Sequence, residues 1–276
     1  MPANAKDHYD HVTDSWKEFM GDNLHFGYFE TEDMELPRAT EKLIEKLLEL
    51  SDIHGNSRVL DVGCGIGGPA LFVYEKFGCS IDGISNSERG VQLAAAAARE
   101  KGYDDVRFKV ADGLANGFPD GTFDVVWIME ATHLFSDKRA LFRECCRVLK
   151  DGGTLALCDV TQLMLLPMHK GLWHFLKHLK EYYQLMKAFG PAQVMTLGDY
   201  CNLLIEAGFN DVTAVDISRK TLPTMTRWKE NAQRYANSED DSFAKKDVDV
   251  FIRGCEIDEA FMKQGIYGYG MVRAAK

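Results

Sequence analysis

From residue 58 onward, short β-forming runs alternate with longer helical runs, and this alternation leaves the chain few folds to adopt. Strands that alternate with helices form βαβ units, which build a mostly parallel sheet. The predicted strands are Arg58–Val62, Ser80–Ile84, Val106–Val110, Phe123–Ile128, Thr154–Val160, Asp211–Asp216 and Tyr267–Val272, and the predicted helices between them are Gly67–Phe77, Glu88–Lys101, Lys138–Leu149 and Leu197–Ala207. The sequence therefore predicts an α/β protein in which helices cover both faces of a seven-stranded sheet.

Glycines mark several of the predicted boundaries. Gly78 and Gly102 follow helical runs, where a left-handed C-cap is expected. Asp151-Gly152-Gly153 is expected to form the same kind of turn after the helix that precedes it. The final run, Tyr267–Val272, follows a long excursion and can pair antiparallel at the edge of the sheet.

Two segments interrupt the alternation. Residues 1–50 precede the first strand and are expected to form a helical lid, with a glycine and aromatic cluster at His25–Phe29. Residues 161–195 are an insertion that is either a helix packed on the core or a cap over a pocket at the strand ends, where open α/β sheets bind ligands. We favour the cap, because the insertion follows the end of a strand. It carries Trp173, His174, Phe175, His178, Tyr182, Tyr183 and Phe189. The chain of 276 residues is thus divided into a lid (1–50) and one domain (51–276) with a cap at about 161–195.

A glycine-rich turn, Gly63-Cys64-Gly65-Ile66-Gly67-Gly68, joins the first strand to the first helix of the alternating region. Glycine is needed where a ligand touches the main chain, because a Cβ would hold the ligand away. The turn also satisfies the pattern of dinucleotide-binding loops, so the glycines alone do not identify the ligand. Asp61, two residues before the turn, indicates a cationic or amino-bearing ligand rather than a pyrophosphate. Asp82 lies near the position of a dinucleotide ribose acid, but it falls inside the second strand.

Four motifs follow in order along the chain: the glycine loop, Ala111-Asp112-Gly113, Phe123-Asp124-Val125-Val126, and Arg147-Val148-Leu149-Lys150 with its Gly-Gly turn. Together they resemble the motifs of class I S-adenosylmethionine-dependent methyltransferases, with the usual spacing. Tyr9-Asp10-x-Val12 and His25-Phe26-Gly27-Tyr28 resemble the lid of a small-molecule branch that includes antibiotic-sugar O-methyltransferases, sterol and tocopherol methyltransferases, and sarcosine/dimethylglycine methyltransferases. The resemblance covers most of residues 9–160 and implies a Rossmann-like fold.

The resemblance implies which residues bind the cofactor, S-adenosyl-L-methionine. Gly63, Gly65 and Gly67 would support its methionine part, Asp61 would reach its amino group through the loop or a water, and a backbone carbonyl near Met129 would contact the amino acid portion. Asp112 would accept a hydrogen bond from the adenine, beside which Gly113 would lie. Many members of the family have an acid at the end of the second strand for the ribose, but this chain has Ser85 there. The candidate ribose contacts are therefore Ser85, Asn86 and Gln92. Asp112 has a second interpretation as an ordinary turn residue, and Gln92 as a surface helix residue.

His133 and Asp159 follow or end the fourth and fifth strands, where the transferred methyl group should lie. His133 matches a proposed general base of the antibiotic-sugar O-methyltransferases, and Asp159 matches the acid that would orient it. Histidine titrates near neutral pH, so it can accept and then release a proton. A purely structural role stays open for each residue: shaping the pocket for His133 and capping for Asp159. His174 and His178 lie four residues apart without a third ligand, so no metal site is expected.

The predicted function is O-methylation of a hydroxyl on a small, largely apolar metabolite or natural product of secondary metabolism. Glu130-Ala131-Thr132 resembles a motif of sterol side-chain methyltransferases, so C-methylation of an isoprenoid is the alternative, followed by N-methylation of an amine. A cofactor-binding protein or a cyclase on the same fold is the alternative outside the transferases. The residues expected to contact the substrate are Tyr9, His25, Tyr28, Glu130, Trp173, Phe175 and Tyr182.

Charge and cysteine content restrict the partners and the compartment. The net charge of −10 comes without a basic block, which argues against nucleic acid as a partner. The seven cysteines form no C-x-x-C pair, which favours reduced thiols in the cytoplasm. No leader peptide and no membrane-spanning run are expected. The expected partner is a small-molecule substrate, and an oligomer is possible without being indicated.

Overall fold

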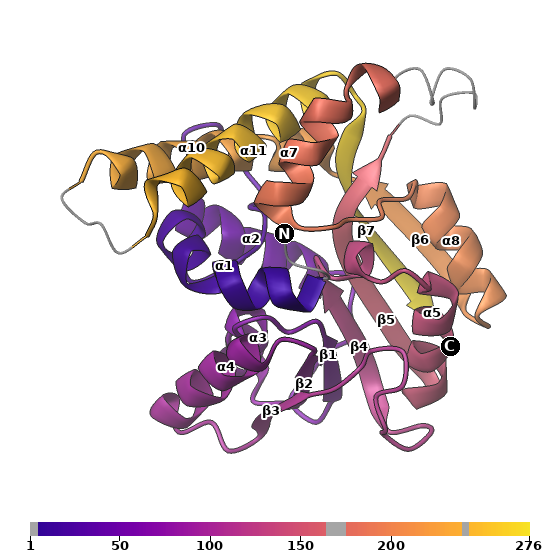
Figure 1. Ribbon diagram of the computed structural model, residues 1–276. Coiled ribbons are helices and arrows are strands. Elements are labelled where there is room, and N and C mark those ends of the chain that lie inside the picture. Colours follow the sequence, from indigo (N-terminus) through magenta and orange to yellow (C-terminus); the bar gives the residue numbers. More distant parts are fainter. Residues whose placement is uncertain (1–4, 164–174, 239–242) are drawn as a thin grey trace.

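The computed structural model describes residues 5–163, 175–238 and 243–276, and its centre is a seven-stranded sheet (Figure 1). The strand order is β3-β2-β1-β4-β5-β7-β6, and β7 alone runs antiparallel to its neighbours. The strands are β1 (Arg58–Val62), β2 (Ser80–Ser85), β3 (Val106–Val110), β4 (Phe123–Met129), β5 (Leu149–Gln162), β6 (Asn210–Asp216) and β7 (Tyr267–Ala275). The predicted Rossmann-like α/β class is confirmed.

Two details at this end of the sheet differ from the prediction. β7 lies between β5 and β6 instead of at the edge, and most of its residues are buried, as a strand with two neighbours requires. Asp151-Gly152-Gly153 does not form a separate helix-ending turn, because β5 already begins at Leu149 and includes these residues. The register between β4 and β5 shifts between Phe123 and Val125, and this irregularity accommodates the glycine pair.

The helices begin and end close to the predicted positions. Gly78 and Gly102 are left-handed C-caps with φ of 64° and 71°, as predicted. Ser87 and Asp137 accept hydrogen bonds from the first turns of α4 and α5, which fixes where those helices start. The helices are α1 (Ala5–Met20), α2 (Leu36–Leu48), α3 (Gly68–Phe77), α4 (Glu88–Lys101), the 3₁₀ turn η1 (Thr132–Leu134), α5 (Lys138–Val148), α7 (Leu179–Phe189), α8 (Leu197–Glu206), α9 (Ser218–Thr221), α10 (Pro223–Ala236) and α11 (Lys245–Lys263).

The sequence analysis did not resolve α10 and α11, which occupy the excursion before β7. Together with α1 and α7 they form a helical layer at one end of the sheet (Figure 1). Aromatic rings join this layer: Phe251 of α11 lies 5.1 Å from Phe19 of α1 and 6.3 Å from Trp16, measured between ring centres. Asn231 of α10 donates a hydrogen bond to the Phe19 carbonyl, 2.8 Å away. The amino-terminal helix is thus held by the last helices of the chain.

Apolar side chains fill both faces of the sheet. One cluster joins α1, α2 and the late helices to the sheet through residues such as Leu43 and Trp127, both almost completely buried. The other packs α5 and α8 against the opposite face through residues such as Phe142 and Leu204. Because both faces are covered, ligand access is left to the carboxyl ends of the strands.

Candidate active site

The loop after β1 is built around glycines in left-handed conformation. Gly63, Gly65 and Gly67 have φ of 87°, 52° and 86°. The amides of Gly63 and Cys64 both donate to the Ile84 carbonyl at the end of β2, at 2.8 and 3.0 Å. These two hydrogen bonds hold the start of the loop against β2. The rest of the loop backbone projects beyond the sheet.

The three glycines have different surroundings. A Cβ on Gly63 would overlap the Cβ of Ala131, and one on Gly67 would lie 2.8 Å from the Cβ of Ala94. A Cβ on Gly65 would meet no atom within 4 Å. Gly63 and Gly67 therefore permit close packing of the protein on itself, whereas the backbone at Gly65 faces open space that a ligand can approach.

Asp61 lies in β1, two residues before this loop, and is 3% exposed. Its Oδ2 has no hydrogen-bond partner within the described part of the chain, and burial raises the pKa of the carboxyl to about 7. Trp127, its neighbour across the β1–β4 pairing, also leaves its indole nitrogen without a partner in those residues. Both side chains line a cavity of about 10 Å³, which is roughly the space of one water molecule. The cavity has room for one water beside the carboxyl, and contact between Asp61 and the amino group of a ligand stays a prediction.

The predicted ribose and adenine contacts lie at the ends of β2 and β3, except for Gln92, which lies in α4. Asn86, Gln92 and Asp112 are exposed, while Ser85 is half-buried and accepts a hydrogen bond from the Ser87 amide at 3.2 Å. Asp112 Oδ1 accepts from the Leu114 amide at 2.9 Å, so this carboxylate shapes the turn in addition to any contact with a ligand.

Three further residues that the sequence analysis discussed, Gly113, Asp82 and Met129, have contacts within the protein. A Cβ on Gly113 would lie 2.7 Å from the Phe135 ring, so protein packing alone is sufficient to require glycine there. Asp82 lies within β2 and forms an ion pair with Arg58 at 3.1 Å, which engages it away from a dinucleotide ribose. Met129 is the last residue of β4, and its buried side chain belongs to the core.

His133, just after β4, and Asp159, within β5, are in direct contact. His133 lies in η1, and its Nδ1 is 2.7 Å from Asp159 Oδ1. Asp159 is fully buried and lies within β5, which continues to Gln162, rather than at its end. Burial opposes ionisation of Asp159, but the charge of His133 and hydrogen bonds from His133 and Thr132 outweigh it and hold the carboxyl pKa below its usual value.

The sequence analysis missed two side chains that complete this contact. Thr132 Oγ1 hydrogen-bonds to Asp159 Oδ2, which also accepts from the His133 amide at 2.9 Å. The Tyr200 hydroxyl comes from α8, which packs with α5 on one face of the sheet, and it lies 3.1 Å from Thr132 Oγ1. Both residues are completely buried. Thr132 follows the flagged Glu130-Ala131 directly, but no local pattern connects Tyr200 to the site.

Glu130 links the lid to the sheet. It is a non-glycine residue with a φ of 52°, a strained conformation that often marks a functional position. Its Oε1 accepts from the Phe26 amide of the lid at 2.7 Å and from the Tyr269 hydroxyl of β7 at 2.6 Å. Burial raises the pKa of Glu130 to about 8 despite these donors. Burial also raises the pKa of the Tyr9 hydroxyl of α1, and the nearby carboxyls of Glu130 and Asp159 add to that shift.

The other predicted substrate contacts lie in different places. His25 is buried beside Phe26; burial lowers its pKa to about 4, and its Nε2 has no partner among the described residues. The Tyr28 ring instead lies 5.8 Å from the Lys46 ammonium group, toward α2.

The cap residues are described only in part. Phe175 is 46% exposed and lies 5.4 Å from the Tyr182 ring, which in turn packs on Phe261 of α11. Trp173 and His174 lie outside the described residues. Within the described ranges, no cluster of histidine, cysteine or acidic residues could hold a metal ion, and no helix is long and apolar enough to cross a bilayer. All seven cysteines are free.

A family model described as a methyltransferase domain matches residues 59–153. The 27-O-demethylrifamycin SV methyltransferase of Amycolatopsis mediterranei is 32% identical over 269 residues, which cover 97% of this chain and 95% of that protein. The chain belongs to the S-adenosylmethionine-dependent methyltransferases. Its cofactor is S-adenosyl-L-methionine, which confirms the predicted family, enzyme class and cofactor.

Solved structures agree with the fold of this methyltransferase. The [4+2]-cyclase SpnF is 26% identical, with a TM-score of 0.83 and coverage of 98% of this chain and 95% of that one. The mycolic acid cyclopropane synthase CmaA1, complexed with SAH and CTAB, is 20% identical, with a TM-score of 0.86 and coverage of 99% and 98%. Relatives of this fold therefore differ in the reactions their names describe, and the site must decide the reaction of this one.

The residues of the methyltransferase fit the cofactor. The open backbone at Gly65 leaves space for an extended ligand, and the unpartnered Asp61 carboxyl suits an amino group. The exposed Asp112 carboxylate has a second oxygen for the adenine amino group. These features are compatible with the cofactor-binding positions named from the sequence, and the roles of the individual residues stay predictions.

Proposed function

We propose that the protein methylates a hydroxyl group on a small, largely apolar metabolite, with His133 as the general base and Asp159 as the residue that orients it. The observation that carries this proposal is the 2.7 Å contact between His133 Nδ1 and a fully buried Asp159. The relative from Amycolatopsis supports it, because its name describes the methylation of an O-demethylated compound.

Asp159 determines which nitrogen of His133 can accept a proton. Its lowered pKa keeps it ionised at neutral pH, so it accepts the hydrogen of Nδ1 and leaves Nε2 as the acceptor. Its other oxygen accepts from Thr132 and from the His133 amide, which fixes the carboxylate plane. His133 can therefore take the hydroxyl proton without first changing its tautomer or orientation.

The bound cofactor supplies an electrophilic methyl group on a sulfonium. The protein must then align the acceptor oxygen with that methyl and exclude water, and alignment alone can lower the barrier by about 7–11 kcal/mol. The half-buried Tyr9 and Glu130 and the buried Phe26 close the lid over the strand ends. We assign Tyr9, His25 and Glu130 to the acceptor side, and a role in natural-product metabolism in the cytoplasm with no nucleic-acid partner.

Replacing His133 by alanine tests the base directly. We expect kcat to fall by a factor of about 10²–10⁴, because a general base contributes that much, while the dissociation constant of S-adenosylmethionine stays unchanged. Asp159→Asn should lose a similar amount, because an amide can hold the wrong tautomer. His54→Ala is the control, since His54 is an exposed histidine before β1. Methyl transfer to a panel of hydroxyl acceptors is the measurement, and unchanged turnover in His133→Ala would exclude the base.

C-methylation of an isoprenoid is the second candidate. The observation that favours it is the half-buried Glu130 carboxyl, grouped with Tyr269, Phe26 and Tyr9. Carbon acceptors need aromatic faces for a cationic intermediate and a late base. If Glu130→Gln abolishes methylation of an isoprenoid acceptor while His133→Ala does not, this candidate replaces the first. If the protein is instead an N-methyltransferase, it should methylate amine acceptors, and the rate should be unchanged in His133→Ala. A product that forms without gaining a methyl group would indicate a cyclase.

A further inference from the structure

One helix of the layer above the sheet carries apolar side chains that nothing in the described chain covers. Phe175, Leu176, Leu179, Tyr183 and Met186 are 46%, 60%, 50%, 39% and 40% exposed. They lie on α7 and the residues just before it, at the outer surface of the layer beside α11 (Figure 1). We call these five residues the α7 apolar face.

The spacing of these residues shows that the α7 apolar face is separate from the side of α7 that packs on the protein. Leu179, Tyr183 and Met186 follow each other by four and three residues, which places them in one stripe along α7, while Phe175 and Leu176 precede His178, where the backbone leaves the helical conformation. A different stripe faces inward: Tyr182 packs against Phe261 at 5.4 Å, and Ala188 is almost fully buried. The two stripes meet at Phe175, whose ring lies 5.4 Å from that of Tyr182, while Leu179, Tyr183 and Met186 stay exposed on the outer side of α7.

Lysines accompany the α7 apolar face. Lys177, Lys180 and Lys187 are exposed, and the Lys187 ammonium group lies 4.6 Å from the centre of the Tyr183 ring. Between residues 175 and 190 the only acidic residue is Glu181, although the whole chain has a net charge of −10. A basic and apolar strip on an acidic protein is complementary to an anionic surface with an apolar interior.

We propose that the α7 apolar face docks on an anionic lipid surface. The apolar stripe would enter the boundary between headgroups and acyl chains, and the three lysines would contact the anionic headgroups. A second copy of the chain suits this face less well, because two copies would bring their lysine rows together.

Docking at this position would place the site close to the lipid. The segment that leaves α7 is bonded to the candidate active site, because the Gln193 amide donates to the His133 carbonyl at 2.7 Å. This part of the inference rests on the proposed function: a largely apolar acceptor partitions into lipid, so an enzyme on the membrane surface would meet it there. The docking itself does not depend on which atom is methylated.

Flotation of the full-length protein with lipid vesicles tests the proposal. We expect binding to vesicles of phosphatidylcholine mixed with phosphatidylglycerol, much weaker binding to phosphatidylcholine alone, and loss of binding at high salt. Leu179→Ser should weaken binding by on the order of tenfold, because it removes one inserted side chain. Changing Lys177, Lys180 and Lys187 together to glutamine should weaken binding to the mixed vesicles by about fivefold per charge.

Ile205→Ser is the matched control, because Ile205 is 58% exposed but lies on α8, away from the lysines. This variant should bind vesicles like the unchanged protein, and all variants should keep the thermal unfolding temperature and the affinity for S-adenosylmethionine. Equal binding by Leu179→Ser and the unchanged protein, or binding that ignores lipid charge, would overturn the proposal. A dimer detected by light scattering and lost in Leu179→Ser would assign the face to a second copy instead. Vesicle binding is measured without an acceptor, so it stands or fails independently of His133.

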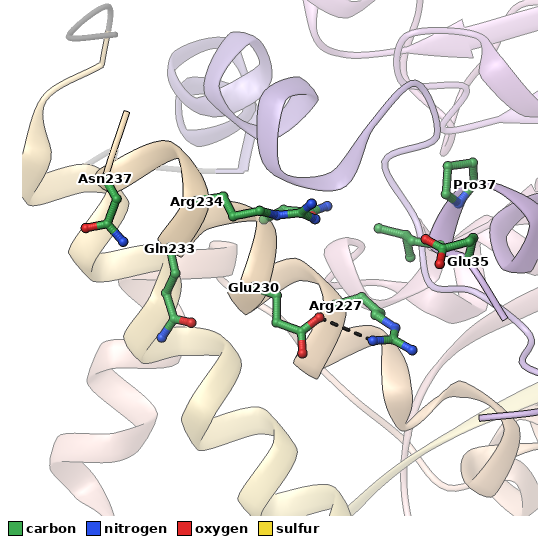
Figure 2. Close-up of a pocket in the computed structure, with 9 residues that line it drawn as sticks. Glu35, Pro37, Arg227, Glu230, Gln233, Arg234 and Asn237 are labelled. Atoms are coloured by element: carbon green, nitrogen blue, oxygen red, sulfur yellow. Dashed lines mark hydrogen bonds and ion pairs between the residues drawn. The ribbon is translucent and has the colours of Figure 1, made fainter. Parts of the chain in front are cut away.

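A different cavity carries no such inference. The groove between the start of α2 and α10 has a volume of about 690 Å³, and Arg227, Arg234, Glu35 and Glu230 project into it (Figure 2). Arg227 already pairs with Glu230 at 3.3 Å and with the Glu32 carbonyl at 2.9 Å. The two arginines and two glutamates of the groove balance each other in charge, so the groove does not select an anionic or a cationic ligand.

Discussion

The polar groups at the ends of β2 and β3 lie at the surface, whereas those at the ends of β4 and β5 lie in the interior. Asp112 and Asn86 are exposed, and Asp112 is held by a short-range turn contact with the Leu114 amide. Asp159 and Thr132 are completely buried, and their partners come from distant parts of the chain. Both groups lie at the same end of one parallel sheet, so topology alone does not create the difference.

The difference follows from what each half must do. In the proposed function, the half of the site at the ends of β2 and β3, called here the cofactor half, has to admit and release S-adenosylmethionine, so Asn86 and Asp112 keep water contact. The other half has to hold His133 in one tautomer, which requires a carboxylate whose hydrogen bonds are already formed. A buried and fully bonded network gives that rigidity, since its members have no alternative partners. The following three changes sharpen this comparison.

The largest effect is expected for Glu130→Gln on the pH dependence of stability. The folded-state pKa of Glu130 is raised to about 8, so its proton is retained on folding while the unfolded chain ionises near its ordinary value. Stability from this group is therefore present at low pH and is lost as pH rises from about 4.5 to 8, a difference of about 3–5 kcal/mol. Glutamine stays neutral and can accept the same two hydrogen bonds, so the variant should gain stability relative to the unchanged protein as pH rises.

Urea unfolding at pH 5 and at pH 8.5 measures this effect. Glu100→Gln serves as the control, because Glu100 is an exposed carboxylate on α4, in the cofactor half. The control should leave the difference between the two pH values unchanged. Parallel pH curves for Glu130→Gln and the unchanged protein would show that Glu130 ionises normally, and the contrast between the two halves would then be weaker than proposed.

Gly65→Ala tests the open half. Alanine at a left-handed φ costs about 1 kcal/mol of stability, and the added methyl group enters the space assigned to the cofactor. We expect the dissociation constant of S-adenosylmethionine to rise by about tenfold or more, equivalent to ~1.4 kcal/mol. Gly121→Ala is a close match, because Gly121 also has a left-handed φ, 61°, and open space at its Cβ, but lies before β4. Calorimetric titration should show weaker binding in the first variant only, and equal affinities would remove Gly65 from the cofactor site.

The smallest effect is expected for Tyr200→Phe, which shortens the buried network at its far end. The Tyr200 hydroxyl contacts Thr132, which in turn bonds to Asp159. Losing one neutral hydrogen bond of about 1 kcal/mol should lower kcat by roughly fivefold without changing the affinity for S-adenosylmethionine. Thr132→Val removes the next link, so the double variant should be no slower than Thr132→Val alone. Additive losses would mean that Tyr200 acts on stability rather than on the orientation of Asp159.

Much of the fold could be predicted because the signals are local. The run Arg58–Val62 and the helix Glu88–Lys101 have the predicted limits, since β-type residues, an N-cap serine and a glycine C-cap act over a few residues. The error at β7 has a non-local cause. Whether Tyr267–Ala275 pairs on one side or on two depends on β6 packing beside it, which no short pattern in either strand encodes.

The candidate site shows the same division. His133 and Asp159 could be proposed because each follows a recognisable strand and matches a family motif, and the structure brings them into contact. Tyr200 could not be proposed, because an isolated tyrosine in an amphipathic helix has the pattern of an ordinary core residue. Phe26 binds Glu130 only through its backbone amide, and because every residue except proline has such an amide, the sequence does not indicate this contact.

The sequence by itself determined the seven strands and the helices Gly68–Phe77, Glu88–Lys101, Lys138–Val148 and Leu197–Glu206 between them, the position of the glycine loop and the family to which the chain belongs. These properties depend on backbone preferences and spacings within a few residues, or on motifs that occur in a set order. The tertiary structure alone decided that the lid amide at residue 26 bonds to Glu130, that Tyr200 supports Thr132, and that one side of α7 faces outward. Those outcomes depend on how whole helices pack on the sheet, since packing selects among contacts that the local pattern leaves equally available.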